Sequence, residues 1–117
     1  MRLELPWPPS ILSPNRIAHW RVKAKAKAKY KSDCYYLCVS QEFEDDGQNI
    51  PIKIIFHPPT KRSFDLDNRI AAMKSGIDGV AEAFGVNDKR FRPMTADIGE
   101  VVKGGMVVLI LNEGEEK

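Results

Sequence analysis

The sequence predicts a single α+β domain spanning residues 1–117, with a small mixed or antiparallel sheet and two main helices in the order β-α-β-α-β-β. Three observations support this. The 117 residues suffice for one domain with a modest core. Long segments rich in helix-forming residues alternate with short apolar runs, and proline or glycine clusters separate them. We expect the helices to cover one face of the sheet.

The first half of the chain predicts a strand, a long helix and a second strand. Residues 1–7 alternate in polarity and end in a proline cluster, which excludes a helix. Residues 17–41 are rich in alanine, lysine and leucine and are expected to be helical. One broad side of that helix would carry Val22, Ala26, Tyr30, Cys34 and Leu37. Residues 50–56 form an apolar run stopped by two prolines, as in a buried strand.

The second half predicts another helix and a hairpin. A helix over residues 67–84 would end at Gly85, a residue suited to the left-handed conformation. Its apolar stripe would consist of Ile70, Met73, Ile77, Val80 and Phe84. Residues 98–102 and 106–111 flank Lys103-Gly104-Gly105, a sequence typical of a hairpin turn.

The charge distribution favours a polyanionic partner, although the net charge is only +2. Residues 14–32 hold seven basic side chains and no acid, while acids gather elsewhere along the chain. Such a polarised chain can present a local positive field to DNA. The alternative is a lysine-rich helix face that is simply solvated.

Hydropathy and cysteine use narrow the class of protein. The longest apolar runs are too short for a membrane span, and the acidic, proline-containing N-terminus is unlike a secretory signal. We therefore expect a cytoplasmic protein. Cys34 and Cys38 are four residues apart, and His19 and His57 are distant in sequence, so reduced thiols are expected rather than a zinc site.

The carboxylates Asp65, Asp67 and Asp88 predict a magnesium site. Mg²⁺ prefers oxygen ligands, and it would relieve their mutual repulsion and lower the pKa of a bound water. On a helical wheel, Lys74 and Asp78 line up with Asp67 along one edge, where an amine can stabilise charge on a phosphate. Two alternatives stay open. Asp65 or Asp67 can be a helix N-cap, and Lys74 with Asp78 can be an exposed ion pair.

These motifs, in their order and spacing, resemble the RusA family of Holliday junction resolvases. The resemblance spans nearly the whole chain. It is carried by Leu5-Pro6-Trp7-Pro8-Pro9-Ser10, Asp65-Leu66-Asp67-Asn68, Lys74 with Asp78, and Asn87-Asp88.

The resemblance implies an α+β homodimer that binds four-way junctions and related branched DNA. It would make paired nicks with Mg²⁺ or Mn²⁺ during recombination and repair. At the matching positions, Asp65, Asp67 and Asp88 would be metal ligands and Lys74 the catalytic amine. A phage or prophage origin is also implied.

The chain departs from the family pattern at two positions. The family's lysine commonly follows the second aspartate by four residues, whereas Lys74 follows Asp67 by seven. On a continuous helix this shift is about 4.5 Å along the same face. Arg69 can then serve as the phosphate-binding cation in its place. Asn87 stands where an acid is common.

Basic and aromatic residues around these motifs are the candidate DNA contacts. They are Arg16, His19, Trp20, Arg21, Lys23, Lys61, Arg62 and Arg69. Trp20 can stack on an unpaired base or can be a core or dimer residue, and His19 can be a loop hydrogen-bonding residue. Two other functions remain open: a non-catalytic protein that binds branched DNA, and a nuclease for flaps or forks.

Overall fold

The structure, a computed structural model, describes residues 1–112. These residues form an α+β fold with four strands and three α-helices, which confirms the predicted class; two helices, not the one predicted, lie between β2 and β3. The chain divides into two compact units. Among the described residues, the sheet unit comprises 1–7, 44–63 and 87–112, and the helical unit comprises 8–43 and 64–86. In the described part of the chain, no helix combines the length and the hydropathy that a membrane crossing requires.

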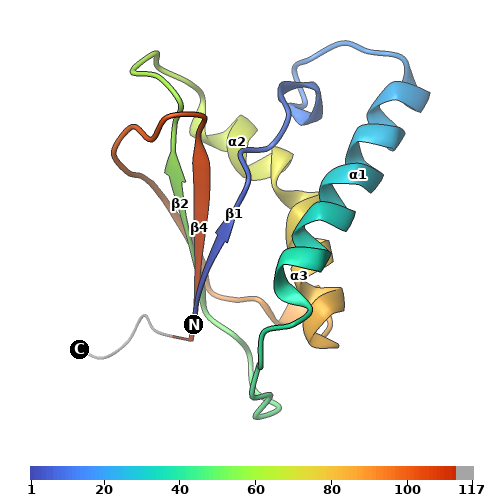
Figure 1. The fold of residues 1–117 in the computed structure, drawn as a ribbon, viewed down its shortest axis with the longest axis vertical. Helices are drawn as coiled ribbons and strands as arrows, with labels where there is room; N and C mark the ends of the chain where they lie inside the picture. The colour runs from blue at the N-terminus through green and yellow to red at the C-terminus, as the bar shows by residue number, and fades with distance from the viewer. Residues whose placement is uncertain (113–117) are drawn as a thin grey trace. The chain divides into compact units, whose positions relative to one another are not determined.

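The sheet unit is built on one mixed four-stranded sheet in the order β1-β4-β2-β3. Its strands are β1 (Arg2–Leu5), β2 (Ile52–His57), β3 (Met94–Ile98) and β4 (Met106–Leu111). β4 is antiparallel to both β1 and β2, whereas β2 and β3 are parallel. Figure 1 shows β4 between β1 and β2. Of the two predicted sheet types, the mixed one is therefore correct.

The core of this unit lies along the central strands. Ile52, Ile54 and Phe56 are buried on β2, while the intervening Lys53 is exposed, as the alternation of a strand requires. The ring of Trp7 packs edge-to-face on Phe56 with centroids 5.9 Å apart. Gly105, at φ 79°, leaves room for Trp7, because a Cβ there would lie 2.9 Å from the tryptophan side chain.

The predicted hairpin of residues 98–102 and 106–111 is wrong. β3 ends at Ile98 and pairs with β2, so β3 and β4 are not neighbours. Residues 99–105 instead connect the two strands, and the Gly99 and Val102 amides donate to the carbonyls of Phe56 and Pro58. The glycines do form a turn, with φ 81° at Gly104. A turn sequence reports only on the local backbone conformation. Which strands pair depends on contacts between segments that are distant in the sequence.

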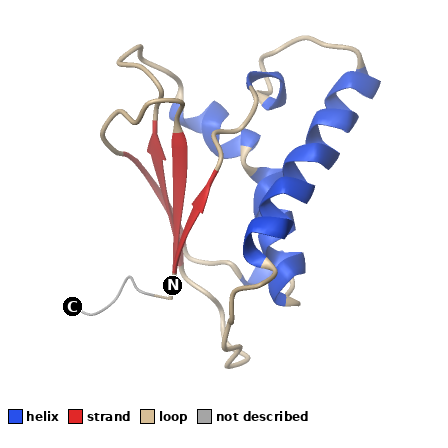
Figure 2. Ribbon diagram, viewed as in Figure 1, coloured by secondary structure: helices blue, strands red, loops and turns tan. Residues whose placement is uncertain are grey.

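The helical unit contains α1 (Trp20–Cys38), α2 (Leu66–Ala72) and α3 (Lys74–Phe84), drawn as blue ribbons in Figure 2. The second half of α1 packs against α3. Its buried side chains are Tyr30, Cys34 and Cys38. Val22 and Leu37, which were expected on the same side of α1 as Tyr30, are 50% and 49% exposed. The buried residues are spaced four apart, starting from Tyr30. The prediction included Tyr30 and Cys34 but not Cys38.

Both thiols are free and buried, as the prediction of reduced cysteines expects. Burial raises the pKa of Cys34 to about 12 and that of Cys38 to about 11. Since the thiolate is the reactive form, neither cysteine is a candidate nucleophile in the folded protein.

The predicted continuous helix over residues 67–84 is also wrong, because the helix is interrupted at Met73, between α2 and α3. Its backbone has ψ −9°, and its amide donates to carbonyls two to four residues back. Met73 is fully buried and accepts a hydrogen bond from the Tyr30 hydroxyl at 3.2 Å. A Ser75-Gly76 pair follows after Lys74, a combination found at helix kinks. α3 then ends at Gly85 in the left-handed conformation, as predicted.

Candidate functional site

Asp65 caps the N-terminus of α2. Its Oδ1 accepts a hydrogen bond from the Asp67 amide at 3.0 Å, and its Oδ2 accepts one from Asn68 Nδ2 at 3.4 Å. The N-cap alternative is therefore confirmed for Asp65. Each carboxylate oxygen has a further lone pair, so capping leaves both able to bind another group.

Asp67 lies in the first turn of α2 and is exposed. Its carboxylate has no hydrogen bond or ion pair with any residue in 1–112. One residue, Leu66, separates it from the capping Asp65, so the start of α2 carries two acids two positions apart in the sequence.

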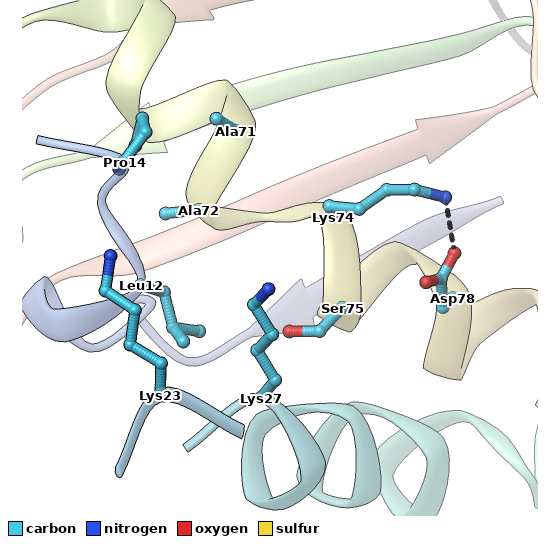
Figure 3. A pocket seen from close by; sticks show the side chains of 9 residues that line it. All are labelled: Leu12, Pro14, Lys23, Lys27, Ala71, Ala72, Lys74, Ser75 and Asp78. Carbon is cyan, nitrogen blue, oxygen red and sulfur yellow. Dashed lines mark hydrogen bonds and ion pairs between the residues drawn. The ribbon is translucent and has the colours of Figure 1, made fainter. Parts of the chain in front are cut away.

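Lys74 and Asp78 form an ion pair on α3, with Nζ 2.8 Å from Oδ1 (Figure 3). Their side chains are 65% and 36% exposed, so the i,i+4 alternative is confirmed. An exposed pair of this kind is weak, worth a few tenths of a kcal/mol. The break at Met73 puts Lys74 on a different helix from Asp67, so the predicted common helix edge is wrong.

Asp88 belongs to the sheet unit, where it begins the 3-10 turn Asp88–Arg90. Asn87 caps this turn, since its Oδ1 accepts from the Lys89 amide at 2.9 Å. An asparagine is a good cap, which gives a structural reason for the departure at this position.

Arg90 and Asp45 hold the same turn in place, and neither was among the residues predicted from the sequence. Two guanidinium nitrogens of Arg90 donate to the two oxygens of Asp45 at 2.6 and 3.1 Å, and Arg90 also donates to the Gln48 carbonyl. The hydrogen bonds from Arg90 lower the pKa of Asp45 to about 2. No sequence pattern could have found this pair, because 45 residues separate its members.

The predicted ligand set thus draws on both units, with Asp65 and Asp67 in the helical unit and Asp88 in the sheet unit. In residues 1–112, no three His, Cys, Asp or Glu side chains are grouped closely enough to hold a metal ion. Mg²⁺ commonly binds through one or two carboxylates, with waters and substrate phosphates completing its shell. The two exposed carboxylates of Asp65 and Asp67, at the start of α2, fit that chemistry.

The start of α1 presents aromatic and basic groups to solvent. His19 caps the helix by accepting from the Arg21 amide at 3.1 Å, which confirms its hydrogen-bonding role. Its ring stacks on that of Trp20 with centroids 5.8 Å apart, and the Arg21 guanidinium lies 5.2 Å from the Trp20 centroid. Trp20 is 68% exposed, so the core alternative is wrong for this residue.

Lys23 lies in α1, and the other basic candidates lie in three places. Arg16 donates to Ser10 Oγ at 3.2 Å ahead of α1. Lys61 and Arg62 are exposed in the sheet unit, in the loop after β2. Arg69, in the last turn of α2, has its guanidinium 5.8 Å from the ring centroid of Phe64.

A relative covers most of the chain, although no protein-family model matches it. An uncharacterized protein of Xylella fastidiosa strain Temecula1 is 35% identical over 117 aligned positions. The alignment covers 93% of this chain and 74% of the relative. The chain belongs to the family of this Xylella protein. Because so much of the chain is covered, the shared sequence extends over both units.

Proposed function

We propose that the protein is a Mg²⁺-dependent endodeoxyribonuclease that resolves four-way junctions and related branched DNA by paired nicks, as RusA-like resolvases do. The observation that carries the proposal is the exposed pair of carboxylates at the start of α2, one of which also caps the helix. The weakly paired amine of Lys74 and the basic start of α1 support it. A RusA-like version of the α+β fold is part of the same proposal.

In this proposal, Asp65 and Asp67 hold the cation together with Asp88, and bound Mg²⁺ supplies Lewis-acid polarisation of a phosphoryl oxygen. Asp65 is oriented for this by the hydrogen bonds that it accepts from the Asp67 amide and Asn68. Lys74 donates from its ammonium group to a non-bridging phosphate oxygen, where negative charge develops in the transition state.

The proposal includes a homodimer, since paired nicks on a symmetric junction require two sites. The exposed Trp20 ring can then serve either as a stacking platform for an unpaired base or as a dimer contact. Arg21, Lys23, Lys61 and Arg62 are the proposed phosphate contacts that steer and hold the DNA.

The decisive experiment incubates the protein with a synthetic mobile junction and Mg²⁺, beside an Asp67→Asn variant. The matched control is Asp33→Asn, which removes a carboxylate from α1 that pairs with Lys29. We expect paired nicks from the wild type and the control, and binding without nicks from Asp67→Asn. If the wild type makes no nick over a range of salt and metal concentrations, the proposal fails.

A second candidate is a protein that binds branched DNA without cutting it. The observation that favours it is the break at Met73, which places Lys74 on a different helix from the acidic motif. Such a protein would bind junctions equally well with and without Mg²⁺, and Asp65→Asn would leave binding unchanged.

A panel of flaps, forks and four-way junctions at equal concentration would also separate a flap or fork nuclease from a resolvase.

A further inference from the structure

A cavity of about 370 Å³ lies within the helical unit (Figure 3). Its apolar walls come from the segment before α1 and from α2. Its polar lining consists of Lys23, Lys27, Lys74, Ser75 and Asp78. Three lysines and a serine thus line a concave surface that carries one carboxylate.

The lysines of α1 differ in how they are neutralised. Lys29 pairs with Asp33 at 2.9 Å, and Lys31 pairs with Glu82 at 3.4 Å. Lys23 and Lys27, which line the cavity, have no acidic partner among residues 1–112.

Asp78 does not offset the charge of these two amines, because it already pairs with Lys74. Lys23 and Lys27 are four residues apart, so they share one face of α1, and Figure 3 shows their side chains extending in the same direction. Like charges at this spacing repel. An anion between them would convert that repulsion into attraction.

The hydroxyl of Ser75 adds a donor to the same cavity. Its Oγ is buried and has no hydrogen-bond partner in the described part of the chain. A buried hydroxyl left without a partner costs about 1–3 kcal/mol. The cavity therefore combines two unneutralised ammonium groups with a hydroxyl that needs an acceptor.

We propose that this cavity binds one phosphate group of the DNA backbone, whose oxygens accept hydrogen bonds from Lys23, Lys27 and Ser75. A phosphate offers several acceptor oxygens, so one group can satisfy all three donors, and lysine is a common point-charge partner for it. Because Ser75 follows Lys74 directly, the bound phosphate would be a neighbour of the one that is cut. Naming DNA as its source rests on the proposed function, whereas the anion site itself does not.

The anion site is tested first with inorganic phosphate, in metal-free buffer, by NMR titration of backbone amides. We expect saturable shifts at Ser75 and Gly76 in the wild type, their loss in Lys23→Ala/Lys27→Ala, and weaker binding by Ser75→Ala. Lys25→Ala is the matched control, since Lys25 is an exposed lysine of α1 outside the cavity lining. Absent shifts in the wild type, or equal shifts in the double variant, would overturn the proposal.

The source of the phosphate is tested by junction binding without metal at several salt concentrations. In Lys23→Ala/Lys27→Ala, we expect an affinity about tenfold lower and a salt slope smaller by about 1, as one lost phosphate contact predicts. Unchanged binding by this variant overturns the inference, and it leaves the nuclease proposal intact if the wild type cuts. Lost binding combined with an uncut junction supports the inference and removes the nuclease proposal.

Discussion

The Nζ of Lys74 lies 2.8 Å from Asp78 Oδ1, one turn further along α3. The pair orients the amine that the proposed chemistry requires. Because both side chains are substantially exposed, it contributes only a few tenths of a kcal/mol to the stability of the fold. Substitutions here should therefore change function far more than folding.

Lys74→Ala should reduce the single-turnover nicking rate by about 100-fold, the usual cost of losing one donor to a developing oxyanion. Lys74→Arg should retain part of the rate, and Asp78→Asn should lose less than Lys74→Ala. Melting temperatures should stay close to that of the wild type. The Lys29→Ala/Asp33→Asn variant removes a comparable pair on α1 and should cut normally. Cutting at the wild-type rate by Lys74→Ala would exclude the lysine and leave Arg69 as the candidate cation.

Asp65 should show two separable roles. Asparagine is as good an N-cap as aspartate, so Asp65→Asn should keep the stability of α2 while abolishing nicking. Asp65→Ala should also lower the free energy of unfolding by about 1 kcal/mol, through loss of the cap. Chemical denaturation and junction cleavage measure the two effects.

Asp67 can be compared with Asp65, because it lies in the same helix turn but does not cap the helix. Asp67 accepts no hydrogen bond from the described residues, so Asp67→Asn should lose cleavage without a stability change. Removing its charge near the phosphates should leave junction binding equal or tighter. Loss of junction binding in both Asp65→Asn and Asp67→Asn would indicate that these acids maintain the fold instead.

The fold class and the approximate positions of most elements could be predicted because they depend on local composition and periodicity. The strand partners could not. Residues 98–111 contain a good turn sequence, yet β4 pairs with β1 and β2, and that choice is made by contacts distant in sequence. A helical wheel likewise assumes 100° per residue, and the backbone at Met73 departs from it.

In the candidate site, too, features set by nearby residues could be predicted, and contacts between distant segments could not. The capping position of Asp65 and the pairing of Lys74 with Asp78 follow from spacing, and both were predicted as alternatives. The Arg90–Asp45 pair and the cavity around Lys27 and Ser75 depend on segments far apart in the chain. Lys27 in the sequence is one lysine of an alternating run, with nothing to distinguish it from Lys25.

The Asp45–Arg90 pair should make stability depend on acid pH. The pKa of Asp45 is lowered in the folded state from 3.8 to about 2, mainly by hydrogen bonds from Arg90. Its contribution is therefore present above pH 3.8 and is lost as the pH falls towards 2. Asp45→Asn should melt below the wild type at pH 6, and the difference should shrink between pH 4 and pH 2 in thermal scans.

The same variant tests the link from this pair to Asp88. Arg90 holds the turn that begins at Asp88, so Asp45→Asn should weaken Mg²⁺-dependent cleavage without abolishing it. Asp33→Asn is the control, because Asp33 pairs with Lys29 on α1 and, within residues 1–112, forms no hydrogen bond or ion pair with this turn. A constant melting difference at every pH would show that Asp45 acts through something other than its charge.

Gly79 should be indispensable to the contact between α1 and α3. A Cβ at this position would overlap the backbone carbonyl oxygen of Lys31, which cannot move as a flexible side chain can. Helix propensity alone predicts that Gly79→Ala stabilises α3 by about 1 kcal/mol, whereas overpacking predicts a loss of about 1–3 kcal/mol. The two effects have opposite signs, so urea denaturation distinguishes them. We expect destabilisation, and a more stable Gly79→Ala variant would show that α1 and α3 are not packed so closely in solution.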